Sequence, residues 1–116
     1  MKRPNDADRL NHILDAIAKI ERYLQGFDLH TFESNELTID AVVRNMEIIG
    51  EAITGLDRGL KAKYTDVEWR FATAMRNRLI HGYFDVDAKI VWNTTQSDLP
   101  ELRKEVELIL KDLDKE

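Results

Sequence analysis

Apolar residues recur with a helical period along most of the chain. In residues 6–25 they follow the i, i+3, i+4, i+7 spacing of a helix with one buried face, and in residues 35–56 they recur at spacings of three to five residues. Gly26 stands just past the first segment, where a helix commonly ends. These patterns predict two long helices. Their apolar positions are Leu10, Ile13, Leu14, Ile17, Ile20 and Leu24 in the first, and Leu37, Val42, Met46, Ile49, Ile53 and Leu56 in the second.

A capping motif predicts a third helix in the middle of the chain. Residues 65–68 read Thr-Asp-Val-Glu, which fits the capping box in which a hydroxyl and a carboxylate bind the first free backbone amides. The helix is predicted to run to about Ile80, and Gly82 can end it. Its apolar positions are Phe71, Met75 and Leu79.

Two further capping signals follow. The Asp-Val-Asp step at residues 85–87 offers an N-cap for a short fourth helix that includes Ile90 and Val91. At residues 98–101, an Asp, a first-turn Pro and a Glu at the third helical position predict the start of a fifth helix. Its predicted buried face carries Leu99, Leu102, Val106, Ile109 and Leu113.

These elements predict an all-α, up-and-down bundle of about five helices, because most connections between the main helices are short. We expect residues 1–116 to form a single domain, since the sequence has no repeat, linker or low-complexity tract. Only 5 Gly and 2 Pro occur. That scarcity argues against an all-β sandwich, which needs frequent turns.

Composition excludes several classes of function. The chain has no cysteine, which rules out disulfides, thiolate zinc sites and thiol catalysis. It shows neither the apolar core of a standard export signal nor an apolar run long enough to cross a membrane, so we expect a cytoplasmic protein. A net charge of −5, from 17 basic and 22 acidic residues, argues against nucleic-acid binding through a broadly positive surface. Contact with RNA would need a local basic cluster, and the candidates are Lys61, Lys63, Arg70, Arg76 and Arg78.

The densest polar group is RNRLIHGY, residues 76–83, at the predicted end of the third helix. A histidine such as His81 titrates near neutrality and can move the proton of a ribose 2′-hydroxyl or of the leaving 5′-oxygen. The guanidinium of Arg76 can bind the non-bridging phosphate oxygens and stabilise the charge of the transition state. Asn77 shares a helix face with His81 and can hold the imidazole or the phosphate in register. The set is sufficient for metal-free cleavage of an RNA phosphodiester.

Residue chemistry alone also fits a structural role for this group. A histidine at a helix C-terminus interacts favourably with the helix dipole, and a helical arginine is commonly solvated or ion-paired. Arg76 and His81 project about 140° apart on an ideal helix, so they converge only if the helix frays at Gly82 or if two copies meet across a two-fold axis. Because Arg-x4-His occurs by chance in many proteins, both interpretations stay open at this level, and the structural one is favoured.

RNRLIHGY resembles the Arg-x4-His motif of the HEPN superfamily, and specifically the Arg-x4-His-x-Tyr form found in HepT-like toxins of HepT/MntA toxin–antitoxin systems. The similarity extends to RNMEIIGEA at 44–52, VEWRFATAMRNRLIHGYF at 67–84 and VDAKIVWNTTQSDLPEL at 86–102, and to the helix order. Together these segments cover most of the chain and are more specific than the motif alone.

The resemblance implies a dimeric helical bundle that sets two Arg-x4-His motifs at one cleft and acts as a metal-independent endoribonuclease without a cofactor. Carried over by position, Arg76 and His81 are the catalytic pair, and Asn77 is the polar residue that supports them. In some members of the family the motif tyrosine, here Tyr83, is AMPylated by a partner nucleotidyltransferase antitoxin, which silences the toxin. The expected partners are a second copy of the chain, that antitoxin and RNA.

Two other functions remain open from the sequence. The first is a non-catalytic module that binds a nucleotide or docks a nucleotidyltransferase. The second is a plain helical dimerisation scaffold, in which Arg76 and His81 would be freely replaceable. Dimerisation is also favoured by Val43 and Ile48, which flank the apolar stripe of the second helix and add apolar surface beyond the needs of one small core.

Other histidines and carboxylates have simpler interpretations. His12 and His30 lack partners at metal-ligand spacing and are expected on the surface, so no metal site is predicted. Glu47 and Glu51 lie four residues apart beside arginines, and ion pairing is favoured over a pair of catalytic carboxylates. An alternative is that Glu47 faces the third helix and positions Arg76 or Arg78. The aromatic residues Trp69 and Trp92 are expected in the core or at a dimer interface.

Overall fold

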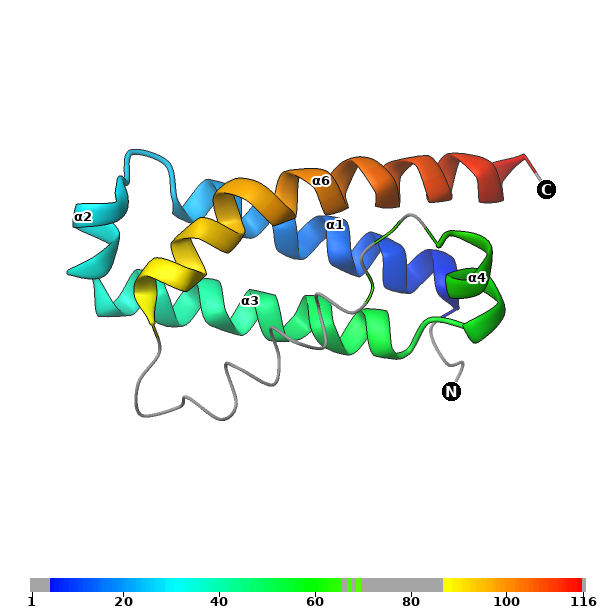
Figure 1. Cartoon of the computed structure of the whole chain (residues 1–116), viewed down its shortest axis with the longest axis horizontal. Coiled ribbons are helices and arrows are strands. Elements are labelled where there is room, and N and C mark those ends of the chain that lie inside the picture. Colours follow the sequence, from blue (N-terminus) through cyan, green and yellow to red (C-terminus); the bar gives the residue numbers. More distant parts are fainter. Residues whose placement is uncertain (1–4, 66, 68, 70–86, 116) are drawn as a thin grey trace.

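The computed structural model describes residues 5–65, 67, 69 and 87–115, and these residues form five helices and no strand. The three long helices lie side by side, and α1 runs antiparallel to both α3 and α6 (Figure 1). The described part of the chain therefore confirms the predicted all-α bundle. The predicted third helix and its end at Gly82 lie almost wholly outside the described residues. The helices are α1 (Asp6–Tyr23), α2 (Leu29–Glu33), α3 (Glu36–Thr54), α4 (Arg58–Lys63) and α6 (Ala88–Asp114).

Helix α1 begins and ends where the sequence predicts. The Asn5 side chain accepts a hydrogen bond from the Asp8 backbone N–H at 2.8 Å, and the Asp8 carboxylate accepts one from the Asn5 N–H at 3.2 Å. This capping box satisfies two of the amides that a helix start leaves free. Gly26 adopts a φ of 81° just beyond the helix, a conformation that costs glycine little. The predicted apolar face is buried, except that Leu14 is only partly buried.

Helix α3 confirms the second predicted helix, with one error at its start. Asn35 caps it by accepting a hydrogen bond from the Thr38 N–H at 3.0 Å. Val42, Met46 and the following apolar positions are buried, but Leu37 is 82% exposed. A separation of five residues turns the helix by about 500°, so Leu37 projects about 140° away from Val42 and misses the buried face.

Two short helices were not predicted. Residues 29–33, expected to be part of a connector, form α2, and residues 58–63 form α4. The Asp28 carboxylate caps α2 by accepting from the Thr31 N–H at 2.8 Å, and this hydrogen bond lowers the pKa of Asp28 below its usual range. Phe32 is fully buried, with its ring centroid 5.5 Å from that of Trp92 in α6.

Helix α6 corrects the predicted C-terminal half. Asp87 caps it as predicted, since its carboxylate accepts from the backbone N–H groups of Lys89 at 3.0 Å and Ile90 at 3.3 Å. The helix then continues for 27 residues with Pro100 inside it. Separate fourth and fifth helices are therefore wrong, and Asp98 lies mid-helix rather than at an N-cap. Partial burial there raises the pKa of the Asp98 carboxyl.

The continuity of α6 follows from competing energies. Pro100 cannot donate to the carbonyl of Gln96, which costs a helix about 3 kcal/mol. Burial of a large apolar side chain stabilises by about 1.5–3 kcal/mol, and α6 buries such residues on both sides of the proline. Figure 1 shows the helix bending between its yellow and red halves, as proline in a helix commonly causes. The buried apolar residues of α6 are Val91, Leu99, Leu102, Val106 and Ile109.

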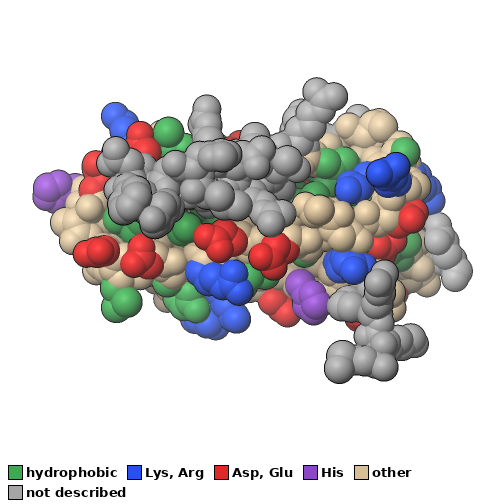
Figure 2. Space-filling view, turned by 90° about the horizontal axis from the view of Figure 1, so that it is seen from below, with side chains coloured by type: hydrophobic (Ala, Val, Ile, Leu, Met, Phe, Trp, Pro, Cys, Tyr) green, Lys and Arg blue, Asp and Glu red, His purple; other side chains and the backbone are tan. Residues whose placement is uncertain are grey.

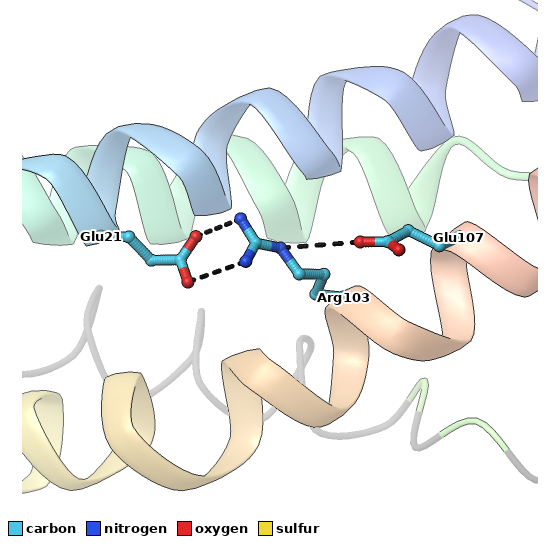
Figure 3. A network of polar contacts seen from close by, with 3 residues as sticks. All are labelled: Glu21, Arg103 and Glu107. Atoms are coloured by element: carbon cyan, nitrogen blue, oxygen red, sulfur yellow. Dashed lines mark hydrogen bonds and ion pairs between the residues drawn. The ribbon is translucent and has the colours of Figure 1, made fainter.

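The core lies between α1, α3 and α6, and an ion-pair network joins α1 to α6 beside it. Arg103 of α6 binds both carboxylate oxygens of Glu21 in α1, and its Nε lies 3.7 Å from Glu107 (Figure 3). The fork of two parallel hydrogen bonds fixes how α1 and α6 lie against each other. Val43 and Ile48, expected at a dimer surface, are partly buried against this core.

Candidate functional site

The four residues singled out by the sequence, Arg76, Asn77, His81 and Tyr83, lie outside the described residues. So do Arg70 and Arg78 of the predicted basic cluster. The structure therefore does not test how these side chains are arranged. It does describe the residues on both sides of this segment, together with the faces of α3, α4 and α6 that surround the core.

The described chain before the motif is fastened near the C-terminal end of α6. The Tyr64 hydroxyl donates to the Asp112 carboxylate at 3.1 Å. The Trp69 indole N–H donates to the Tyr64 carbonyl at 3.1 Å, and Val67 between them is buried. Trp69 packs against the hydrophobic core, so the core interpretation of this tryptophan is confirmed.

The described chain after the motif begins at the opposite end of α6. Asp87 caps the helix there, and Val91 follows in the core. Trp92 packs against the core and its ring meets that of Phe32, which confirms the core interpretation of Trp92 as well. Tyr64, before the motif, thus lies near the C-terminal end of α6, whereas Asp87, after the motif, lies at its N-terminal end (Figure 1).

Helix α4 carries the described part of the basic cluster. Lys61 and Lys63 belong to this helix, and the structure adds Arg58, which the sequence interpretation left out. The Lys61 ammonium donates to the Ile53 carbonyl at 3.3 Å, and the Lys63 ammonium lies 5.6 Å from the Tyr64 ring centroid. A count of basic residues in each six-residue window of the sequence would have found Arg58 together with Lys61 and Lys63.

The carboxylates of α3 are placed as expected for an ion-paired face. The Arg44 guanidinium lies 3.5 Å from the Glu47 carboxylate, and their side chains are 62% and 36% exposed. Glu51 is also exposed. The contact with Arg44 confirms ion pairing for Glu47. Whether Glu47 also contacts Arg76 or Arg78 falls outside the described residues.

Comparison with known families shows which family the chain belongs to. Its sequence matches the family described as "Ribonuclease HepT-like" over residues 13–109, a range that includes the motif at 76–83. The chain belongs to this HepT-like family. The resemblance to HepT-like HEPN proteins drawn from the sequence is thereby confirmed.

Curated relatives of this HepT-like chain carry ribonuclease names. A Methanocaldococcus jannaschii protein named "Gamma-glutamylcyclotransferase and putative RNase" is 40% identical over 106 residues, which are 91% of this chain and 48% of that protein. A "Putative RNase" of Caldanaerobacter subterraneus is 36% identical over 102 residues, 88% of this chain and 91% of the relative. A "Probable ribonuclease HepT" of Thermococcus cleftensis is 36% identical over 111 residues, 96% of this chain and 100% of the relative. The chain spans about half of the first relative. No solved structure matches it.

The described residues of this HepT-like protein hold no cluster of His, Asp or Glu side chains that could bind a metal ion. His12 on α1 and His30 on α2 are both exposed, as predicted. Within the same residues, no helix is long and apolar enough to cross a membrane.

The HepT-like chain also has a groove of about 290 Å³ between α1 and α6, beside Pro100. Glu21 is the one titratable residue among those that line it on the described chain, and Arg103 already binds both of its oxygens. The groove therefore offers no free acid or base for catalysis. Its other lining residues are Ile17, Ile20, Leu24, Gln25, Phe27, Trp92, Thr95, Gln96, Leu99 and Pro100.

Proposed function

We propose that this protein is the toxin of a type VII toxin–antitoxin system and acts as a metal-independent endoribonuclease. Its catalytic pair is Arg76 and His81, supported by Asn77, and its antitoxin is a nucleotidyltransferase that AMPylates Tyr83. The observation that carries the proposal is the match to the HepT-like ribonuclease family across a range that contains the complete Arg-x4-His-x-Tyr motif. The ribonuclease names of the relatives support the same activity.

The proposed reaction needs no metal because the two motif side chains supply the required chemistry. His81 takes the proton of the ribose 2′-hydroxyl, and the 2′-oxygen then attacks the adjacent phosphorus. The bond from phosphorus to the 5′-oxygen breaks, that oxygen takes a proton from protonated His81, and a 2′,3′-cyclic phosphate remains. Arg76 stabilises the extra negative charge on the non-bridging oxygens at the transition state.

The protein is proposed to act as a homodimer whose two motifs share one cleft. A two-fold axis would bring together side chains that point apart on one helix, which is why the dimer matters for Arg76 and His81. Light scattering at micromolar concentration is expected to give twice the mass of the chain. A monomer that cleaves RNA at the full rate would contradict the shared cleft.

Incubation of the purified protein with total RNA tests the activity. We expect cleavage with and without EDTA, because no step uses a metal ion. Activity that is abolished by EDTA and restored by magnesium would overturn the metal-free mechanism. If no RNA is cut while the protein still binds its nucleotidyltransferase partner, the non-catalytic docking module becomes the better description.

Control by the antitoxin predicts a specific effect of Tyr83→Phe. In the proposed modification the tyrosine oxygen attacks the α-phosphorus of ATP and pyrophosphate leaves, so that AMP is bound through a phosphodiester. That group adds bulk and negative charge beside the phosphate that the motif must bind, and both oppose RNA binding. Tyr83→Phe lacks the hydroxyl, so we expect it to cleave RNA normally and to remain toxic when the nucleotidyltransferase is co-expressed.

Mass spectrometry after co-expression distinguishes the possible results. The native protein is expected to gain the mass of AMP on Tyr83 alone. Tyr23→Phe on α1 is the matched control, and it is expected to be modified and silenced like the native chain. Adenylylation of another residue, or neutralisation without any adenylylation, would contradict this mode of control.

A further inference from the structure

Helix α4 is short and strongly basic. Its sequence is RGLKAK, three cations in six residues with no acidic side chain. The whole chain carries a net charge of −5. The acid directly before the helix, Asp57, is its cap, and its carboxylate accepts from the Gly59 N–H at 3.0 Å.

The packing of α4 leaves Arg58 and Lys63 exposed, whereas Lys61 is half-buried and its ammonium donates to the Ile53 carbonyl. Leu60 and Tyr64 are partly buried against the core, so the helix face between them points inward. At about 100° per residue, Ala62 then projects directly outward, Arg58 lies about 40° to one side of it, and Lys61 and Lys63 lie on the two flanks. The outer surface between the three cations is formed by Gly59 and Ala62, which are small and exposed. We call Arg58, Lys61 and Lys63 the α4 basic face.

Contacts at both ends hold α4 in place. At its start, the Asp57 backbone N–H donates to the Asp6 carboxylate of α1 at 3.1 Å. At its end, the hydrogen bond from Tyr64 to Asp112 ties it to α6. Figure 2 shows Lys and Arg side chains at one end of the molecule, and further Lys and Arg side chains among the Asp and Glu side chains along the middle of that view. Figure 1 places α4 at the same end.

We propose that the α4 basic face binds the sugar-phosphate backbone of the RNA substrate. The inference deepens the proposed function and rests on it. An RNA strand carries one negative charge per nucleotide, and exposed acidic surfaces repel it, so a fixed group of three cations is where the strand is held most favourably. Lysine and arginine donate hydrogen bonds to phosphate oxygens, and the small outer residues let the strand approach the helix closely.

A binding experiment that does not depend on cleavage tests this surface. The probe is a single-stranded 2′-O-methyl RNA oligonucleotide with a fluorescent label, which lacks the 2′-hydroxyl that the proposed reaction needs. Anisotropy gives its affinity at several KCl concentrations for the native chain and for Arg58→Gln/Lys61→Gln/Lys63→Gln. Each lost phosphate contact is expected to reduce the slope of log affinity against log salt by about 0.7, or about 2 for three contacts. This corresponds to an affinity loss of about 100-fold at 0.1 M salt.

A matched variant distinguishes the effect of the α4 basic face on RNA binding from the effect of the chain's net charge. Lys19→Gln/Lys89→Gln/Lys104→Gln removes the same charge from exposed positions on α1 and α6, and its slope is expected to stay within about 0.5 of the native value. Arg58 is the most outward of the three cations, and Arg58→Gln alone is expected to reduce the slope by about 0.7. This single variant tests the surface if the triple variant does not fold.

The outcomes distinguish this inference from the proposed function. Equal slopes for the two triple variants, or no binding of the oligonucleotide by the native chain, would overturn the RNA-binding role of α4, even if the native chain cleaves RNA. Slopes that depend on α4 in a chain that does not cleave RNA would support the binding surface and overturn the nuclease assignment.

Discussion

Replacing His81 by alanine is expected to reduce the rate of RNA cleavage by about 10²–10⁴-fold, because a positioned proton-transfer group typically contributes that much. Replacing Arg76 by alanine is expected to cost about 10²–10³-fold, by analogy with the loss of one donor to a developing oxyanion. Initial rates on a labelled RNA measure both effects. Circular dichroism is expected to show a folded chain in each case, since both side chains are proposed to line a polar cleft.

Matched variants show whether these losses are specific. His30→Ala on α2 and Arg44→Ala on α3 remove the same side-chain types from exposed positions and are expected to cleave at the native rate. Arg76→Lys keeps the charge but loses the planar fork, and is expected to recover only part of the activity. A folded His81→Ala or Arg76→Ala variant with full activity would show that the residue has no part in catalysis.

The largest effect on stability is expected at Phe32. This side chain is fully buried in α2, and its ring packs against Trp92 of α6. Phe32→Ala removes the whole buried ring and leaves a cavity, so we expect the free energy of unfolding to fall by about 3–5 kcal/mol. Chemical denaturation followed by circular dichroism measures the change.

The control for Phe32 is Leu37, at the start of α3. Leu37 is 82% exposed, so Leu37→Ala is expected to change the free energy of unfolding by less than about 0.5 kcal/mol. If Phe32→Ala does not fold, Phe32→Leu keeps most of the apolar volume and is expected to cost about 1 kcal/mol. Equal effects of Phe32→Ala and Leu37→Ala would contradict the burial of Phe32 in the structure.

The sequence points to the candidate site residues only through resemblance. The spacing of Arg76 and His81 alone fits a structural role as well as a catalytic one. The match to the HepT-like family favours the catalytic role. The α4 basic face has a different origin. Lys61 and Lys63 stand out in the sequence, but only the packing of Leu60 and Tyr64 shows that these lysines flank an outward Arg58.

The long helices α1 and α3 were determined by the sequence itself, because the apolar period, the capping side chains and Gly26 act locally and agree. The short helices α2 and α4 were decided by tertiary structure. Five or six residues are too few to show a period, and isolated helices of that length are not stable in water. The same holds for α6, where a local helix-start signal at residues 98–101 predicts a break between two helices that the structure does not have. A helix cap contributes about 1 kcal/mol, whereas the buried side chains on both sides of Pro100 contribute several times more, so packing against α1 and α2 keeps the helix continuous.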